Sequence, residues 1–131
     1  MELIPNLSKL KVLVVEDLPP AMTLMKSLLR SLGISDIHSA TDGREAQTFL
    51  DNTGEMVDLI ICDWNMPNAN GLELLQQVRT VFPKMLFMMV TANSDEISVK
   101  NAMRCNVDAY VIKPFTADQI EKKLLTLVYR L

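Results

Sequence analysis

Several short apolar runs in this 131-residue chain end directly in side chains that can do chemistry. The residues at those positions are Glu16 with Asp17, Asp63, Thr91, and Lys113 with Pro114. Three carboxylates held close together repel one another, and a hard divalent cation relieves that repulsion. Because all the candidate ligands are oxygen atoms, Mg²⁺ is the natural metal, with water molecules completing its octahedron. The pattern therefore predicts an acidic magnesium site beside a hydroxyl and an ammonium group.

The apolar runs that precede these residues are typical of buried β-strands. The five predicted strands are Val12–Val15, Ile37–Ala40, Leu59–Cys62, Leu86–Val90 and Ala109–Ile112. The first, third and fourth are almost continuously apolar, as expected for strands that helices cover on both faces of a sheet. The second is weaker because it contains His38.

Residues with helical spacing fill the intervals between the strands. The predicted apolar positions are Ala21, Met25, Leu28 and Leu32 in the first helix, Ala46, Phe49 and Leu50 in the second, Leu72, Leu75 and Val78 in the third, Ile97, Ala102 and Met103 in the fourth, and Ile120, Leu124, Leu127 and Leu131 in the fifth. The third helix is expected at about 71–80 and the fourth at about 95–104. The fourth has the thinnest apolar stripe.

Residue types that favour helix ends flank these segments. The predicted boundary residues are Pro19-Pro20 at a helix start, Gly33 just after a helix end, Asp42 with Glu45 and Thr116 with Gln119 as capping pairs, and Pro83 after the third helix. Strand and helix thus alternate five times. Such alternation predicts an α/β fold in which a parallel sheet carries helices on both faces. The carboxyl ends of its strands, where ligands bind in open sheets of this class, share one rim.

Composition excludes several other classes of protein. The length suits one domain, and 49% hydrophobic with 22% charged residues is ordinary for a soluble globular protein. A net charge of −3 without a basic stripe argues against nucleic-acid binding. No apolar run is long enough to span a membrane, and the N-terminus lacks the pattern of a secretory signal, so a cytoplasmic location is expected. Cys62 and Cys105 form no metal-binding motif and are expected to be reduced.

Each rim residue taken alone also has an ordinary structural explanation. An acidic pair after a strand is often a solvated turn, and a lone Asp or Thr there often caps the next helix. Lys-Pro after a strand is often just a turn. The conjunction at four strand ends favours a functional site, because chance placement of all four features is improbable.

The ordered set Glu16-Asp17, Asp63, Thr91 and Lys113-Pro114 resembles the receiver domains of two-component response regulators. The segment DWNMPN, which contains Asp63, and the following GLELL are similar to the chemotaxis branch of that family. The resemblance covers residues 11–130. It implies one flavodoxin-like (βα)5 domain over 1–131, with sheet order 2-1-3-4-5 and a short N-terminal lead-in over 1–10.

The resemblance also implies roles for the rim residues. Asp63 would accept a phosphoryl group, and Lys113 and Thr91 would contact that group. Ligands to Mg²⁺ would come from Asp63, Asp17, Glu16 partly through water, and the backbone carbonyl of Asn65. Backbone N–H groups of Trp64 and Ala92 would contribute to phosphoryl binding. The bond before Pro114 is cis in the family, although an X–Pro bond is expected to be trans from sequence alone.

The resemblance further implies a phosphoacceptor signalling protein rather than a classical enzyme. Thr91 and Tyr110 resemble the family's switch pair, in which Tyr110 turns inward after phosphorylation. The output surface would be the fourth helix, fifth strand and fifth helix. The partners would be a sensor histidine kinase, a downstream target such as a flagellar motor switch or another effector, and a phosphatase, with no direct contact to nucleic acid or membrane.

Two positions depart from the family pattern. Asn93, two residues after Thr91, replaces an acidic residue of the chemotaxis branch, so a phosphoryl lifetime is not transferable. Asn106 stands where Gly is common, and a positive φ there would be tolerated by Asn.

Three alternatives remain. A haloacid-dehalogenase-type phosphatase would need a second Asp at position 65, which is Asn65. A flavodoxin-like nucleotide or FMN binder would need a phosphate-cradling loop after the first strand, where the chain has an acidic segment without glycine. The chain could also be a receiver from a longer regulator or hybrid kinase.

Overall fold

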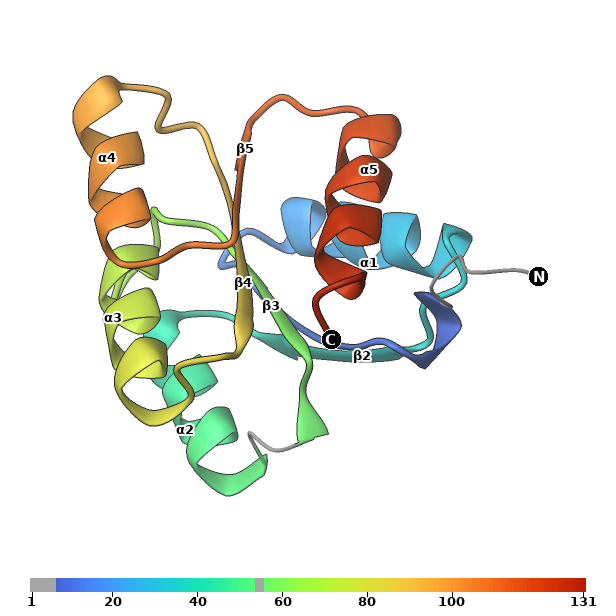
Figure 1. Ribbon diagram of the computed structural model, residues 1–131, viewed down its shortest axis with the longest axis horizontal. Coiled ribbons are helices and arrows are strands. Elements are labelled where there is room, and N and C mark those ends of the chain that lie inside the picture. The colour runs from blue at the N-terminus through green and yellow to red at the C-terminus, as the bar shows by residue number, and fades with distance from the viewer. Residues whose placement is uncertain (1–6, 54–55) are drawn as a thin grey trace.

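The computed structural model describes residues 7–53 and 56–131. Its elements are a short 3-10 helix at Leu7–Lys9, then β1 (Lys11–Val15), α1 (Pro19–Ser31), β2 (Asp36–Ala40), α2 (Gly43–Thr53), β3 (Leu59–Cys62), α3 (Gly71–Val81), β4 (Leu86–Thr91), α4 (Glu96–Arg104), β5 (Ala109–Ile112) and α5 (Ala117–Val128). The strands form one parallel sheet in the order β2-β1-β3-β4-β5 (Figure 1). The expected fold class and strand order are therefore confirmed.

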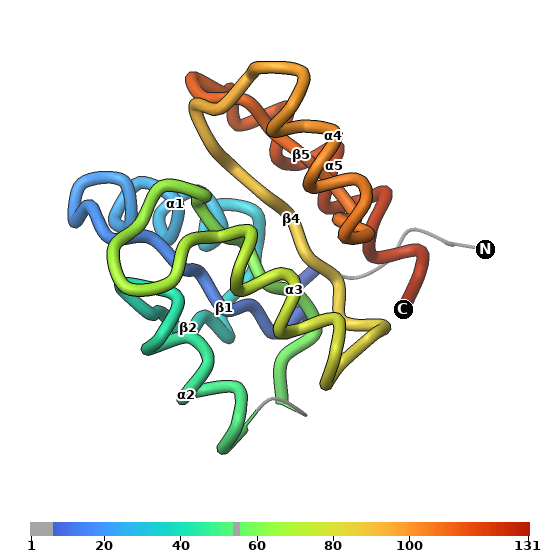
Figure 2. The backbone as a smooth tube through the Cα atoms, turned by 90° about the vertical axis from the view of Figure 1, so that its left-hand side faces the viewer, coloured from blue at the N-terminus to red at the C-terminus, as the bar shows by residue number. Residues whose placement is uncertain are grey.

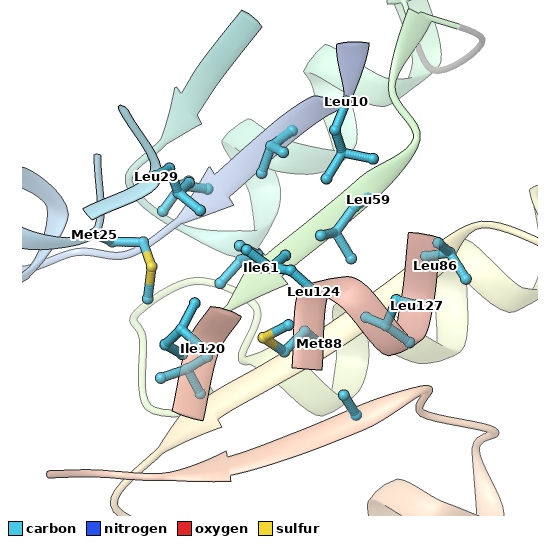
Figure 3. Close-up of a cluster of buried hydrophobic side chains, with 14 of the residues drawn as sticks. Leu10, Met25, Leu29, Leu59, Ile61, Leu86, Met88, Ile120, Leu124 and Leu127 are labelled. Atoms are coloured by element: carbon cyan, nitrogen blue, oxygen red, sulfur yellow. The ribbon is translucent and has the colours of Figure 1, made fainter. Parts of the chain in front are cut away.

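Helices cover both faces of this sheet. α1 and α5 lie on one face, and α2, α3 and α4 lie on the other, as Figure 1 and the rotated view in Figure 2 show. Alternating residues of β1, β3 and β4 point to opposite faces, which gives two hydrophobic cores. The core under α1 and α5 contains Met25, Ile61 and Met88 with the α5 residues Ile120, Leu124 and Leu127 (Figure 3). Burial on both faces explains why these strands are apolar throughout.

The helix boundaries follow the capping signals closely. Pro19 and Pro20 begin α1, and Gly33 follows it with φ of +94°. Thr116 and Gln119 form a reciprocal capping box at the start of α5. At α2 the box is only half formed, because Asp42 accepts from the Glu45 N–H while the Glu45 carboxylate accepts from Thr41 instead.

Several predicted apolar positions lie at the edge of a core rather than inside it, and one is exposed. α1 buries Met25 and Leu29 rather than Leu28 and Leu32, and Leu131 lies exposed beyond the end of α5. In α3 the buried leucines are Leu74 and Leu75, whereas Leu72 is only partly buried.

The stripe predicted for α4 fails most clearly. Ala102 alone is buried in that helix, and the side chains of Ile97 and Met103 are 73% and 65% exposed. Asp95 is the N-cap of α4 and not its first turn, since its side chain accepts from the Ser98 N–H. α4 therefore buries a single residue along its length.

The segment before β5 is fixed by a compact polar network. Asp108 accepts hydrogen bonds from Arg79 and from the Phe87 N–H, and it also pairs with Arg130. Arg79 in addition donates to the carbonyl of Asn106, which has φ of +62° as Asn tolerates.

Both cysteines are free, and Cys62 is buried. No helix in the described ranges is long and apolar enough to cross a membrane.

Candidate functional site

Three carboxylates meet at the carboxyl end of the sheet, as the sequence predicted. Oxygen atoms of Glu16, Asp17 and Asp63 all lie within 4.8 Å of one another. Glu16 and Asp63 are buried, and Asp17 is partly exposed. The rim therefore holds a dense negative charge that opens to solvent on the side of Asp17.

Main-chain hydrogen bonds continue the sheet past the strand ends and fix these residues. The Asp63 N–H donates to the Val15 carbonyl over 3.1 Å, and the Lys113 N–H donates to the Thr91 carbonyl over 2.8 Å. The Glu16 N–H donates to the Ala40 carbonyl in the same way, over 3.0 Å. The side chains at the rim are therefore held by backbone whose position the parallel ladder determines.

Lys113 is the cation of this site. Its Nζ lies 2.9 Å from Glu16 Oε1 and 3.0 Å from Asp63 Oδ2. Burial opposes the charged form of Lys113, but these two hydrogen bonds outweigh it and raise the pKa of the ammonium group. Burial raises the pKa of Glu16 despite the hydrogen bond from Lys113. Lys113 thus remains protonated and holds the Asp63 carboxylate in place.

The donor set fits Mg²⁺. All three side chains offer hard oxygen ligands, and one cation of charge +1 does not neutralise three carboxylates. Asn65 follows Asp63 closely, and its N–H donates to Asp63 Oδ1 over 3.2 Å. The residues that the sequence assigned to a metal are therefore together in space.

A pair of side-chain amides lies beside Asp63. The Asn65 side-chain N–H donates to Asn93 Oδ1 over 2.9 Å, and the Asn93 side-chain N–H donates to Asn65 Oδ1 over 3.4 Å. Each asparagine stands two residues after a rim residue, Asp63 or Thr91, in the loops that follow the neighbouring strands β3 and β4. The sequence showed that equal spacing, but the pairing was missed because it depends on the register of β3 against β4.

Thr91 and Tyr110 both bind the loop that follows β4. Thr91 is completely buried, and its hydroxyl accepts from the Asn93 N–H over 3.2 Å. The half-buried Tyr110 donates its hydroxyl to the Asn93 carbonyl, and burial raises the pKa of that phenol. Asn93 therefore contacts Asn65, Thr91 and Tyr110 through different atoms.

The loop that carries Trp64 and Asn65 is packed closely against its surroundings. The Gly71 N–H donates to the Trp64 carbonyl over 2.9 Å. A Cβ atom at Gly71 would lie 2.5 Å from the Asp63 carbonyl oxygen, so glycine is required for this approach. A side-chain hydrogen bond from Asn68 to Asp42 ties the far side of the loop to the start of α2.

The comparisons with known proteins identify the family. The model for the response regulator receiver domain matches residues 12–125. The chain belongs to this family. The chemotaxis protein CheY-3 of Vibrio cholerae is 34% identical over 133 residues, covering all of both chains. The CheY homolog of Campylobacter jejuni is 38% identical over 117 residues, covering 88% of this chain and 89% of that protein.

Solved receiver domains share the fold. One from Clostridium thermocellum has a TM-score of 0.86 at 24% identity and covers 92% of this chain and 95% of that chain. A complex of CheX with CheY, BeF₃ and Mg²⁺ from Borrelia burgdorferi also gives 0.86, at 22% identity, covering 90% of this chain and 88% of that chain. In this receiver domain the Lys113-Pro114 bond is cis, as the resemblance implied and against the expectation from sequence alone.

Proposed function

We propose that this receiver domain is a phosphorylation-dependent signalling switch whose acceptor is Asp63. The observation that carries the proposal is the contact of Lys113 with Asp63 and Glu16 at a rim of three carboxylates. A carboxylate is an established nucleophile for phosphoryl groups. The rigid strand end orients Asp63, and a sensor histidine kinase would present the phosphohistidine.

The surrounding residues would bind and orient the transferred group. Lys113 would move from the acceptor carboxylate to the phosphoryl oxygens, and the Thr91 hydroxyl would donate to one of them. The N–H groups of Trp64 and Ala92 would add neutral donors. In phosphoryl transfer such positioning and charge neutralisation account for most of the catalysis.

Mg²⁺ would be held by Glu16, Asp17, Asp63 and the carbonyl of Asn65, with Glu16 acting partly through water. When bound, the ion neutralises the charge that collects on the phosphoryl oxygens. The close carboxylates support this assignment, since a divalent cation offsets their mutual repulsion.

Phosphorylation would reach the output surface through the loop after β4. If the Thr91 hydroxyl turns toward a phosphoryl oxygen, it gives up its contact with the Asn93 N–H. The Asn93 carbonyl holds Tyr110, so movement of this loop would let Tyr110 turn further inward. The face of α4, β5 and α5 would then bind a downstream target. The exposed side chains of Ile97 and Met103 on α4 support that role.

A chemotaxis pathway in the cytoplasm is the context that the similarity to CheY-3 and the CheY homolog favours. The target would then be a flagellar motor switch or another effector, and a phosphatase would end the signal.

Acetyl phosphate with Mg²⁺ tests the acceptor. Intact-protein mass spectrometry should show one added phosphate, and Asp63→Asn should abolish it. Equal labelling of Asp63→Asn would assign the acceptor elsewhere. For the switch, beryllofluoride with Mg²⁺ should shift the NMR signals of the Tyr110 ring, and unchanged signals would contradict the proposed movement.

A further inference from the structure

A cavity of about 490 Å³ opens beside Asp63 on the face of the sheet that α1 covers. Its floor includes Val14 and Ile61, and its walls include Ala21 and Leu24 of α1 and Phe115 after β5. The lining is mostly apolar, and Leu24 is 58% exposed although it lies on a wall. A volume of this size is in the range of small-molecule sites.

The polar residues that line the cavity are those of the phosphorylation site. Glu16, Asp63 and Lys113 line it together with the apolar groups. A ligand whose apolar part filled the cavity would therefore place a polar end against the acceptor carboxylate.

The chemistry of the rim limits what that polar end can be. Among the polar groups that line the cavity, Lys113 is held by Glu16 and Asp63 and would be needed by the phosphoryl oxygens, so it is not free to protonate a leaving group. An alkoxide leaving group would need such a proton. The carboxylate released by a mixed anhydride of phosphoric and carboxylic acids is stable without one.

We propose that the cavity receives the apolar chain of acyl phosphates larger than acetyl phosphate, and that Asp63 takes its phosphoryl group from them; this rests on the function proposed above. In the reaction an Asp63 oxygen forms a bond to phosphorus while the bond from phosphorus to the acyl oxygen breaks. The electron pair of that bond leaves with the carboxylate, so no proton or redox partner is required.

Chain length gives the expected size of the effect. Butanoyl phosphate has two methylene groups more than acetyl phosphate, and its leaving group is similarly acidic. Each buried methylene strengthens binding about fourfold, so the second-order rate constant for phosphorylation should rise on the order of tenfold. The gain should appear at low donor concentration and fade at saturation, because chain burial strengthens ground-state and transition-state binding equally.

Four proteins compared with both donors test the proposal by intact-protein mass spectrometry. Ala21→Leu should fill part of the cavity and Leu24→Ser should remove an apolar wall, so each should lose most of the preference for butanoyl phosphate over acetyl phosphate. Thr23→Leu adds bulk to an exposed position of α1 outside the cavity lining and should keep the preference. Leu24→Ser changes an exposed residue, so it keeps the test valid if Ala21→Leu does not fold.

Binding without transfer gives a second measurement. Pentylphosphonate, whose carbon–phosphorus bond is not transferred, should shift the methyl NMR signals of Ala21 and Leu24 more than methylphosphonate does. Equal rates with both donors, or an equal preference in all four proteins, would overturn the cavity proposal and leave Asp63 phosphorylation by acetyl phosphate standing. Failure of the parent to react with either donor would overturn the proposed function as well.

Discussion

Replacing Lys113 by methionine should destabilise the protein by about 3 kcal/mol near neutral pH. The substitution keeps most of the side-chain volume and removes the cation that contacts Glu16 and Asp63 at 2.9 and 3.0 Å. Both carboxylates are buried, so each would lose a charged partner that water does not fully replace.

The magnitude follows from burial and distance. At an effective dielectric constant of about 20, each contact represents roughly 5–6 kcal/mol of attraction, most of which offsets the cost of desolvating the charges. Removing one partner of a buried pair costs about 3–5 kcal/mol. The lower end applies because the Lys113 side chain is 26% exposed. A loss of that size should lower the melting temperature by roughly 10 °C.

The pH dependence identifies the cause. The pKa of Glu16 is raised in the folded state, so the stability linked to Glu16 is complete at low pH and is lost as pH rises through that value. Without Lys113 the pKa of Glu16 rises further. The difference in the free energy of unfolding between Lys113→Met and the parent should therefore grow as pH rises through the raised Glu16 pKa, and it should shrink at lower pH. The difference should also vanish in strong alkali, where Lys113 of the parent loses its proton above its raised pKa.

Urea unfolding at several pH values measures this difference. Lys122→Met is the matched control, because its partner Asp118 is 68% exposed and such pairs contribute about 0.5 kcal/mol or less. Adding Glu16→Gln to Lys113→Met should recover part of the loss, and Mg²⁺ should stabilise Lys113→Met more than the parent. A loss equal to that of Lys122→Met, or one independent of pH, would refute the reasoning.

Three further changes probe the scaffold of the site. Gly71→Ala should cost about 2 kcal/mol and slow phosphorylation of Asp63, because its Cβ would meet two backbone atoms within 2.7 Å; unchanged melting and labelling would contradict this. Tyr110→Phe should cost about 1 kcal/mol and shift the NMR signals of Asn93, whose carbonyl loses a donor; unmoved Asn93 signals would argue against that contact. Asp95→Ala should lower the melting temperature slightly at neutral pH and not in acid. The hydrogen bond from the Ser98 N–H lowers the pKa of Asp95, so the stability that this carboxylate contributes is lost as pH falls through that value. An effect that does not depend on pH would point to another cause.

The strands and the rim were predictable because their signals are local. A strand covered on both faces must be apolar throughout. The end of an apolar run such as Leu59–Cys62 therefore shows where the strand ends and which residue follows it at the rim. In a parallel sheet those ends share one edge, and this shared edge predicted that Asp63, Glu16 and Lys113 would meet.

The features that the sequence did not predict depend on how the helices, strands and loops meet in three dimensions. Helical spacing in α4 could not show that Ile97 and Met103 lack a surface to cover, because that depends on how α4 lies against its neighbours. The Asn65–Asn93 pair and the cavity beside Asp63 likewise arise between segments distant in the chain.

Asn93 is the part of the site through which the proposed switch would act. The backbone of Asp63 and that of Lys113 are held by hydrogen bonds that extend the ladder of the sheet, so neither backbone would move far if a phosphoryl group were bound. Asn93 instead lies in the loop between β4 and α4, and single hydrogen bonds join it to Thr91 and Tyr110, with a side-chain pair to Asn65. Each such bond is worth about 1 kcal/mol, far less than the energy that holds the ladder together. A new contact at Thr91 would therefore be met first by rearrangement at Asn93, and α4, with Ala102 as its one buried residue, is the adjoining element with least packing to resist it.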